Sequence, residues 1–249
     1  MNVIDLNCDM GESFGTYTIG QDDEVITLVS SVNIACGFHG GDPDVMDHTV
    51  ELAKQYKVRV GAHPGFPNLL GFGRWNMDIP PKTLTNIIIY QIGALDIFCK
   101  KNDVIMQHVK PHGNLNNMAD SDTGIATSIV EAVQSINPDL PLYVKPNSEL
   151  ERISKEKGHP YVLELYADRA YNSDMTLVSR RQEGAVITDP HKVAENVVRM
   201  VKEKRITSIT GENIKIEGQS ICVHGDTQSA LEMIKHIHQE LNKENIQIL

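Results

Sequence analysis

VIDLNCDMGES, residues 3–13, is the stretch that decides the fold of this chain. Its residues alternate between a largely polar set and an apolar set: Val3, Asp5, Asn7 and Asp9 against Ile4, Leu6 and Cys8. Successive side chains of a strand point to opposite faces, so this run predicts a strand with one polar face. A buried carboxylate costs about 1–3 kcal/mol unless it is hydrogen-bonded, which indicates that the polar face meets other polar groups.

The same arrangement recurs along the chain, because short apolar runs repeatedly end in a polar tip. The six segments are DLNCDMGES at 5–13, NIACGFHGGD at 33–42, GAHPGF at 61–66, HVKPHGN at 108–114, ELYADRAY at 164–171 and ICVHGD at 221–226. Most of these tips precede a stretch of helical pattern. In α/β barrels the carboxyl ends of the strands carry the chemistry, so the tips predict a shared polar cavity.

Strand and helix patterns alternate without a linker or an internal repeat, which predicts a parallel sheet. Strands are expected near 3–8, 32–37, 58–62, 104–110, 140–144, 161–166 and 219–224, with weaker runs near 184–188 and 213–217. Helices are expected near 43–56, 81–101, 120–135, 148–157, 190–204 and 227–244. The prediction is an α/β fold with one domain over residues 1–249, a distorted (β/α) barrel of seven or eight strands. The stretch 167–187 breaks the rhythm and is expected over the barrel mouth.

Composition narrows the class of protein. The formal net charge is −10 and there is no basic stripe, which argues against a nucleic-acid partner. No apolar run approaches the roughly 18 residues of a membrane span, and no signal-peptide pattern follows Met1, so we expect a cytoplasmic protein with no membrane partner. The four cysteines are far apart and are expected to be reduced.

The motifs resemble those of the LamB/YcsF family. The matching runs are DLNCDMGESFG, NIACGFHGGDP, GAHPGFP with GFGR, YQIGAL, HVKPHGNL, ADRAY, LVSR with GAVI, and ICVHGD, from Asp5 to Asp226. The resemblance implies a barrel related to the glycoside hydrolases and polysaccharide deacetylases. It also implies conversion of 5-oxo-L-proline, ATP and water to L-glutamate, ADP and phosphate, with ATP as a co-substrate that Mg accompanies. The partners that it implies are the 5-oxoprolinase subunits B and C.

Several chemically active positions match the family, and a few depart from it. The matching residues are Asp5, Asp9, Glu12, His39, His63, Lys110, His112, Asp168, Arg169 and His224. Asn116 stands where the family usually has Tyr, and Trp75 follows Arg74 where a second Arg is usual. These departures concern details of the pocket more than the reaction.

Lactam hydrolysis defines what the catalytic residues must do. Amide resonance protects the ring, and phosphorylating its oxygen turns that oxygen into a leaving group. Attack by water then needs a base, for which Asp9 and His112 both remain candidates, and the developing charge needs donors such as Lys110 and Arg169. The predicted catalytic residues are Asp9, Lys110, His112, Asp168 and Arg169.

The substrate is also a carboxylate at neutral pH, so a cation or a nest of backbone N–H groups must meet it. Gly37, Gly40 and Gly41, between the second strand and its helix, are candidates for such a nest. The predicted substrate-binding residues are Asp5, Asn7, Glu12, Gly37, His39, Gly40, His63, Glu164, His224 and Asp226. Asp5 has a structural alternative, in which it bonds loop backbone beneath the site.

Two other functions remain open. Asp9, His39 and His63 are candidates to hold a divalent metal ion in a metal-dependent deacetylase or amidohydrolase. A non-catalytic scaffold or carbohydrate-binding module is the other, although 5% aromatic residues are few for a sugar groove. No GxxxxGK[ST] motif occurs, so the sequence leaves open which subunit binds ATP, as well as the oligomeric state.

Overall fold

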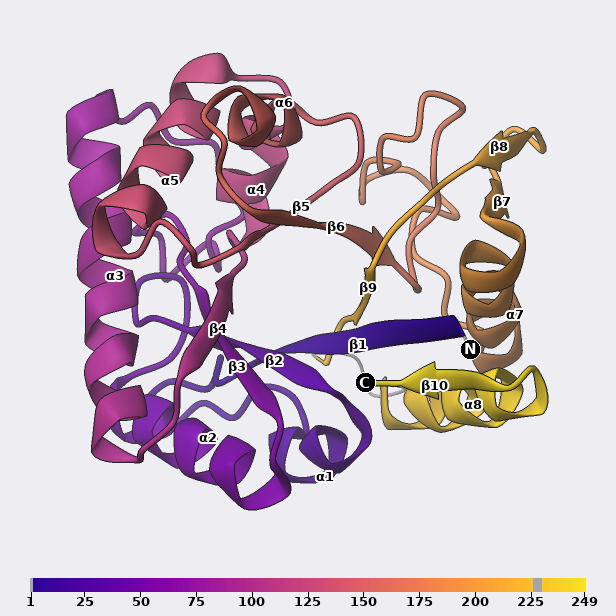
Figure 1. Ribbon diagram of the computed structural model, residues 1–249, viewed down its shortest axis with the longest axis horizontal. Coiled ribbons are helices and arrows are strands. Elements are labelled where there is room, and N and C mark those ends of the chain that lie inside the picture. The colour runs from indigo at the N-terminus through magenta and orange to yellow at the C-terminus, as the bar shows by residue number, and fades with distance from the viewer. Residues whose placement is uncertain (1, 226–229) are drawn as a thin grey trace.

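A computed structural model describes residues 2–225 and 230–249. Within these residues, seven parallel strands close into a barrel: β1 (Asn2–Met10), β2 (Ser31–Ala35), β3 (Arg59–His63), β4 (Met106–Val109), β5 (Leu142–Val144), β6 (Tyr161–Tyr166) and β9 (Ser220–Val223). β9 pairs with β6 on one side and with β1 on the other, which closes the ring (Figure 1). The predicted barrel of seven or eight strands is therefore confirmed.

The weaker strand predictions fall outside this barrel. β8 (Asn213–Lys215) pairs antiparallel with β7 (Arg205–Thr207) in a separate two-stranded sheet. The run expected at 184–188 forms no strand among the described residues and makes a single β-bridge, between Val186 and Arg169. β10 (Ile246–Ile248), which no sequence pattern predicted, pairs with the first residues of β1. Its three residues are too few for a period to show.

Helices surround the barrel (Figure 1). They are α1 (Asp22–Val25), α2 (Pro43–Tyr56), α3 (Pro81–Lys101), α4 (Gly113–Ala119), α5 (Thr123–Ile136), α6 (Glu149–Glu156), α7 (Pro190–Val198) and α8 (Ala230–Lys243), with a 3₁₀ turn at Ile26–Leu28 and a π-turn at Arg199–Glu203. The predicted starts of α2 and α3 are correct. Asp42 caps α2 by accepting from the backbone of Asp44 and Val45, and proline occupies the first helical position. The helix expected near 120–135 begins three residues later, and α4 precedes it.

The two faces of β1 divide the molecule into an apolar shell and a polar interior. Ile4, Leu6, Cys8 and Met10 are buried in the hydrophobic core. Asp5 and Asn7 are also buried, but their side chains bond residues of other barrel strands. The interior of the barrel is therefore lined with polar groups, and the hydrophobic core lies between the strands and the helices.

Close contacts inside the barrel require small residues at particular places. A Cβ on Gly61 of β3 would lie 2.1 Å from the ring of His108, so only glycine leaves room for that imidazole. The loop that follows β6 is pinned by Arg169, whose guanidinium donates to the carbonyls of Val178 and Ala185. This is the stretch expected over the mouth, and its residues 176–181 line the cavity described below.

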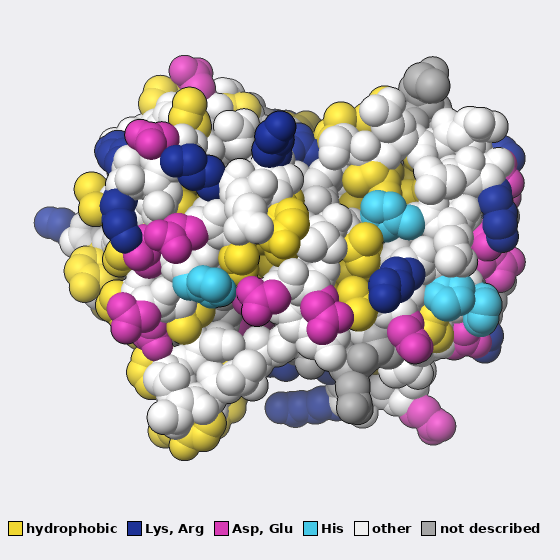
Figure 2. All heavy atoms as spheres, turned by 90° about the horizontal axis from the view of Figure 1, so that it is seen from below, with side chains coloured by type: hydrophobic (Ala, Val, Ile, Leu, Met, Phe, Trp, Pro, Cys, Tyr) yellow, Lys and Arg dark blue, Asp and Glu magenta, His cyan; other side chains and the backbone are white. Residues whose placement is uncertain are grey.

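The outer surface is mixed in character. Figure 2 shows acidic, basic, histidine and apolar side chains interspersed on the face that carries α2 and α8, with no continuous basic stripe on that face. None of the described helices is both long enough and apolar enough to cross a membrane.

Candidate active site

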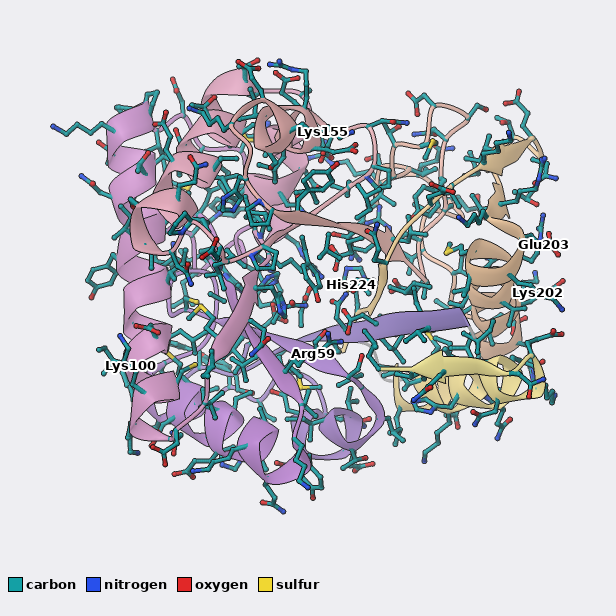
Figure 3. The ribbon with its side chains drawn as sticks, in the orientation of Figure 1. Arg59, Lys100, Lys155, Lys202, Glu203 and His224 are labelled. Carbon is teal, nitrogen blue, oxygen red and sulfur yellow. The ribbon has the colours of Figure 1, made fainter. Side chains whose placement is uncertain are left out.

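A cavity of about 610 Å³ opens at the carboxyl ends of the barrel strands. Seven of the residues predicted for the site line it: Asp9, Glu12, His63, Lys110, His112, Arg169 and His224. They lie in the last residues of β1 and β3 or just after β1, β4, β6 and β9, so strands that are distant in sequence bring their carboxyl ends to one space. In Figure 3, His224 lies near the centre of the molecule, close to the end of β9.

Lys110 is the central cation of this site. Its ammonium lies 2.9 Å from Asp9 Oδ1, 2.9 Å from Glu164 Oε1 and 3.0 Å from Cys222 Sγ. Burial lowers the pKa of Lys110, but the negative charges around it, foremost Asp9, outweigh that effect and hold the pKa well above its ordinary value. Lys110 therefore stays charged, and it acts as an electrostatic group and a hydrogen-bond donor.

Asp9 is held by one oxygen and presents the other to the cavity. Oδ1 accepts from Lys110 and, at 2.8 Å, from Asn33, while Oδ2 lies 3.4 Å from His63 Nε2. Burial raises the pKa of Asp9, but the neighbouring His63 and Lys110 lower it by more, so the net pKa is well below the usual range. The carboxylate stays ionised and fixed in orientation.

Asn7 and Glu164 form a layer beneath Lys110 and do not line the cavity. Asn7 donates to Glu164 Oε1 at 2.9 Å and to Ser220 at 2.7 Å. Both side chains are almost completely buried. They hold Lys110 in place, and a direct contact with substrate is not what their position favours.

Asp5 lies deeper still, at the amino-terminal end of the barrel. It accepts from Arg59 at 2.6 Å, Ser30 at 2.6 Å, Ser31 at 2.8 Å and Tyr143 at 2.9 Å. Burial raises the pKa of Asp5, but the hydrogen bonds from Ser220 and Ser30 and the charge of Arg59 lower it below the ordinary value. Its oxygens are occupied by residues of the fold, so the structure favours the structural alternative for Asp5.

The glycine loop after β2 also has a structural use. The Gly37 N–H donates to the Gly40 carbonyl at 2.9 Å, so it is turned inward to the loop. A Cβ on Gly40 would lie 3.0 Å from the Glu12 carbonyl oxygen. Neither glycine lines the cavity. Gly40 lets this loop approach the loop that carries Glu12, and Gly37 adopts a φ of +87° in the turn.

Three histidines and Glu12 gather on one wall of the site. His63 Nε2 lies 2.9 Å from His112 Nδ1, and the ring of His39 stacks on that of His112 at 3.5 Å. Glu12 Oε1 is 3.3 Å from His39 Nε2 and 3.4 Å from His112 Nδ1. Burial, together with the neighbouring imidazoles, holds the pKa of both His39 and His112 well below its ordinary value.

Gly65 and Gly73 make this wall possible. A Cβ on Gly65 would lie 2.6 Å from His39 Nδ1, and one on Gly73 would lie 2.7 Å from His112 Cδ2. Gly73 also has a φ of +63°, which L side chains rarely adopt. The glycines of GAHPGF and GFGR were visible in the sequence, but only the fold shows that histidine rings fill the space beside them.

Asp168 and His224 form a second group. His224 Nδ1 lies 2.9 Å from both carboxylate oxygens of Asp168, and His224 Nε2 lies 2.9 Å from a guanidinium nitrogen of Arg180. Burial raises the pKa of Asp168, but His224 lowers it below the ordinary value. Asp168 therefore orients His224, and Arg169 fixes the loop through its backbone contacts. Asp226 lies outside the described residues.

Sequence reasoning left several cavity residues out of the site, among them Arg74, Asn116, Lys145, Tyr166, Arg180 and Arg181. The adjacent arginines Arg180-Arg181, in a chain of net negative charge, were the signal in the sequence that could have found part of this set. Both are exposed and line the cavity, to which they add positive charge.

Comparison with known proteins agrees with this geometry. The model of the LamB/YcsF family matches residues 4–249. A Clostridium beijerinckii protein, named as the A subunit of 5-oxoprolinase, is 52% identical over 249 residues, covering 100% of this chain and 98% of that protein. The crystal structure of a lactam utilization protein from Thermus thermophilus superposes with a TM-score of 0.95 at 40% identity, covering 100% of this chain and 99% of the other.

A more distant likeness extends to the fold alone. The structure of T48 deacetylase with substrate superposes with a TM-score of 0.50 at 12% identity, covering 100% of this chain and 87% of the other. The expected likeness to deacetylase barrels is thus one of fold. From the match over nearly its whole length and the 52% identity to a named relative, this chain belongs to the LamB/YcsF family.

Proposed function

We propose that this chain is the A subunit of an ATP-dependent 5-oxoprolinase, which hydrolyses 5-oxo-L-proline to L-glutamate with ATP hydrolysis to ADP and phosphate. The observation that carries the proposal is the Lys110–Asp9 pair at the base of a polar cavity, in a chain that matches relatives of this name over its full length. The need for ATP fits a cytoplasmic enzyme.

The overall reaction sets the demands on the site. The γ-phosphoryl group of ATP is transferred to the lactam oxygen, which neutralises the amide resonance. Water adds to the ring carbon, the C–N bond breaks and the nitrogen leaves as the amine of glutamate, taking a proton. C–N cleavage leaves the phosphoryl group on the new side-chain carboxyl as an acyl phosphate. A second water hydrolyses this acyl phosphate to the carboxylate of glutamate and inorganic phosphate, so atoms and charge balance over ATP, two waters and the lactam.

The residues of the cavity suit these steps. Asp9 Oδ2 faces the space beside His63 and is placed to orient the attacking water and accept its proton. Lys110 offers a permanent positive charge to the oxygen on which charge develops. Arg180, at the rim, is a suitable anchor for the substrate carboxylate or for the incoming phosphoryl group.

ATP is proposed to bind mainly to a partner. The chain has no GxxxxGK[ST] loop, and subunits B and C are the proposed partners that complete the nucleotide site, with Mg accompanying ATP. The arginines at the cavity rim would then meet the phosphoryl group as it arrives. This division explains why a hydrolytic cavity stands beside no recognisable phosphate loop.

An omission assay tests the proposal. Glutamate and ADP are followed with 5-oxo-L-proline and ATP, first with this chain alone and then with subunits B and C added, and each protein is left out in turn. We expect little glutamate from the chain alone and ATP-coupled ring opening from the full set. Absence of glutamate from the full set would refute the function. Full activity from the single chain would refute the division of labour.

A second function is favoured by the wall of histidines with Glu12, which resembles the donor set of metal-dependent amide hydrolases. It would hydrolyse a carbohydrate N-acetyl group or another small amide without ATP. Release of acetate or amine from such substrates in the absence of ATP would support it. Strict dependence of turnover on ATP would exclude it.

A further inference from the structure

The cavity wall brings two imidazoles and a carboxylate to one point. His63 Nε2 and His112 Nδ1 are 2.9 Å apart, and Glu12 Oε1 is 3.4 Å from His112 Nδ1. With His39, each residue of the group offers a ligand atom within 4.8 Å of the others. Glu12, His63 and His112 line the cavity, whereas His39 does not.

The outer nitrogens of the two imidazoles fix their tautomers. His63 Nδ1 lies 2.7 Å from the Lys110 carbonyl and His112 Nε2 lies 2.8 Å from the Phe72 carbonyl. A carbonyl only accepts, so both of these nitrogens carry the proton. In the neutral rings the two inner nitrogens, 2.9 Å apart, then both present lone pairs. Such lone pairs repel unless an electropositive centre lies beside them.

The backbone hydrogen bonds of these two rings are those usual for metal-binding histidines. A ligating imidazole usually donates its other N–H to a backbone carbonyl or carboxylate, which sets the tautomer and the orientation of the ring. Both His63 and His112 do this inside the barrel. The arrangement leaves their inner nitrogens aimed at the same space.

His39 is not placed to be a ligand beside His112. Their rings are parallel within 3° at 3.5 Å, and a metal ion in the plane of one ring would lie well out of the plane of the other. His39 instead packs on His112, with Nε2 3.3 Å from Glu12 Oε1. Neither ring nitrogen of His39 makes a hydrogen bond to another described residue, and Glu12 is the carboxylate that faces Nε2.

We propose that Glu12, His63 and His112 bind one divalent transition-metal ion of the zinc class. Zn–N and Zn–O bonds of about 2.0–2.1 Å put neighbouring ligand atoms about 3.0–3.4 Å apart, close to the observed 2.9 and 3.4 Å. Two imidazoles and a carboxylate favour Zn²⁺, Mn²⁺ or Fe²⁺ over Mg²⁺, which prefers oxygen ligands. Three protein ligands leave a position open to the cavity.

Asp9 differs from these ligands and completes the arrangement. Its Oδ1 is occupied by Lys110 and Asn33, and its Oδ2 lies 3.4 Å from His63 Nε2. Asp9 therefore stands next to the open position, where it can hold a water molecule bound there. The set expected from sequence was Asp9, His39 and His63, and the geometry favours Glu12 and His112 in place of Asp9 and His39.

Metal binding can be measured without substrate, so the result is independent of the proposed 5-oxoprolinase reaction. The full chain is stripped with a chelator and titrated with Zn²⁺ by calorimetry and with Co²⁺ by visible absorption. We expect one equivalent of each ion. His112→Gln and Glu12→Gln should each weaken binding by at least about 10–100-fold. Circular dichroism establishes that each variant is folded.

Two variants serve as matched controls. His191→Gln removes half of a surface histidine pair, His191 and His236, whose ring centroids are 4.4 Å apart. His224→Gln removes an imidazole from the same cavity that is outside the proposed ligand set. Both controls should keep the single equivalent with wild-type affinity.

Three results would overturn the proposal. The first is the absence of stoichiometric metal binding by the wild type, and the second is unchanged metal affinity in both ligand variants. The third is loss of the one bound metal ion in His191→Gln. If a ligand variant does not fold, Cu²⁺ bound to the wild-type chain gives the answer through pulsed electron paramagnetic resonance. Two coupled imidazoles support the site, and none or one refutes it.

Discussion

Lys110 Nζ donates a 2.9 Å hydrogen bond to Asp9 Oδ1 inside the barrel, where the lysine side chain is almost completely buried. The pair joins β1 to the end of β4, two segments about a hundred residues apart in sequence. Charge is thereby fixed at the base of the cavity before any substrate enters. Preorganised charge of this kind needs no reorientation during reaction, which is the reason it stabilises a transition state more than water does.

Lys110→Met should lower kcat by about 10²–10³-fold, because an oriented donor to the developing oxyanion is lost. A rise in KM with unchanged kcat would instead make Lys110 a carboxylate anchor. The same change leaves Asp9 and Glu164 without their buried cation, so stability should fall by about 3–5 kcal/mol in urea denaturation. Adding Glu164→Gln removes one of those charges and should recover part of the stability, but not the rate.

Asp9→Asn should leave the fold intact and lower kcat by about 10²–10⁴-fold, the usual contribution of a positioned acid–base group. An amide keeps the shape of the side chain and its oxygen can still accept from Lys110 or Asn33, so the loss reports on the charge facing the cavity. Steady-state rates in the complete ATP-coupled assay measure it. Wild-type turnover in a folded variant would remove Asp9 from the mechanism.

Asp5→Asn should instead affect stability and not turnover, since the described partners of Asp5 are residues of the barrel floor. We expect a loss of about 2–4 kcal/mol of stability from the broken ion pair with Arg59 and its supporting hydrogen bonds. The kcat per folded molecule should stay within about twofold of wild type. Tyr143→Phe, which removes a single hydrogen bond, should cost only about 1 kcal/mol. A selective loss of kcat in folded Asp5→Asn would return Asp5 to the active site.

Asp22 gives a pH-dependent prediction away from the cavity. Burial raises its pKa to about 6, although the Gly11 N–H donates to it at 2.8 Å. A carboxyl with a raised pKa in the folded state stabilises the fold below its unfolded pKa of about 4, and that contribution is lost as the pH rises through about 6.

Asp22→Asn keeps an oxygen for Gly11 and removes the titration. The free energy of unfolding of the variant, minus that of wild type, should therefore rise by about 2 kcal/mol between pH 4 and pH 6 and level off above. Urea denaturation at several pH values measures this difference. Asp23→Asn, at an exposed neighbouring position, controls for removal of one acidic charge. A difference that does not vary with pH would contradict the raised pKa.

Local sequence was sufficient where local physics decides the structure. Alternation along β1 assigned Asp5, Asn7 and Asp9 to one face, and the structure keeps them on that face. Asp42-Pro43 and Pro80-Pro81 marked the starts of α2 and α3, because capping and the fixed φ of proline act within one helical turn. The repeated polar tips likewise predicted one shared cavity.

Tertiary structure alone decided which polar residues reach that cavity. Asp5 and Asp9 share a strand face and differ by four residues, yet Asp5 is closed in by Arg59, Tyr143 and Ser220, while Asp9 borders open space. The partners that separate them come from β3, β5 and β9, which meet β1 only when the barrel closes. Alternation along a strand determines the face on which a side chain lies. Its depth in the barrel, and therefore its chemistry, depends on strands far away in the sequence.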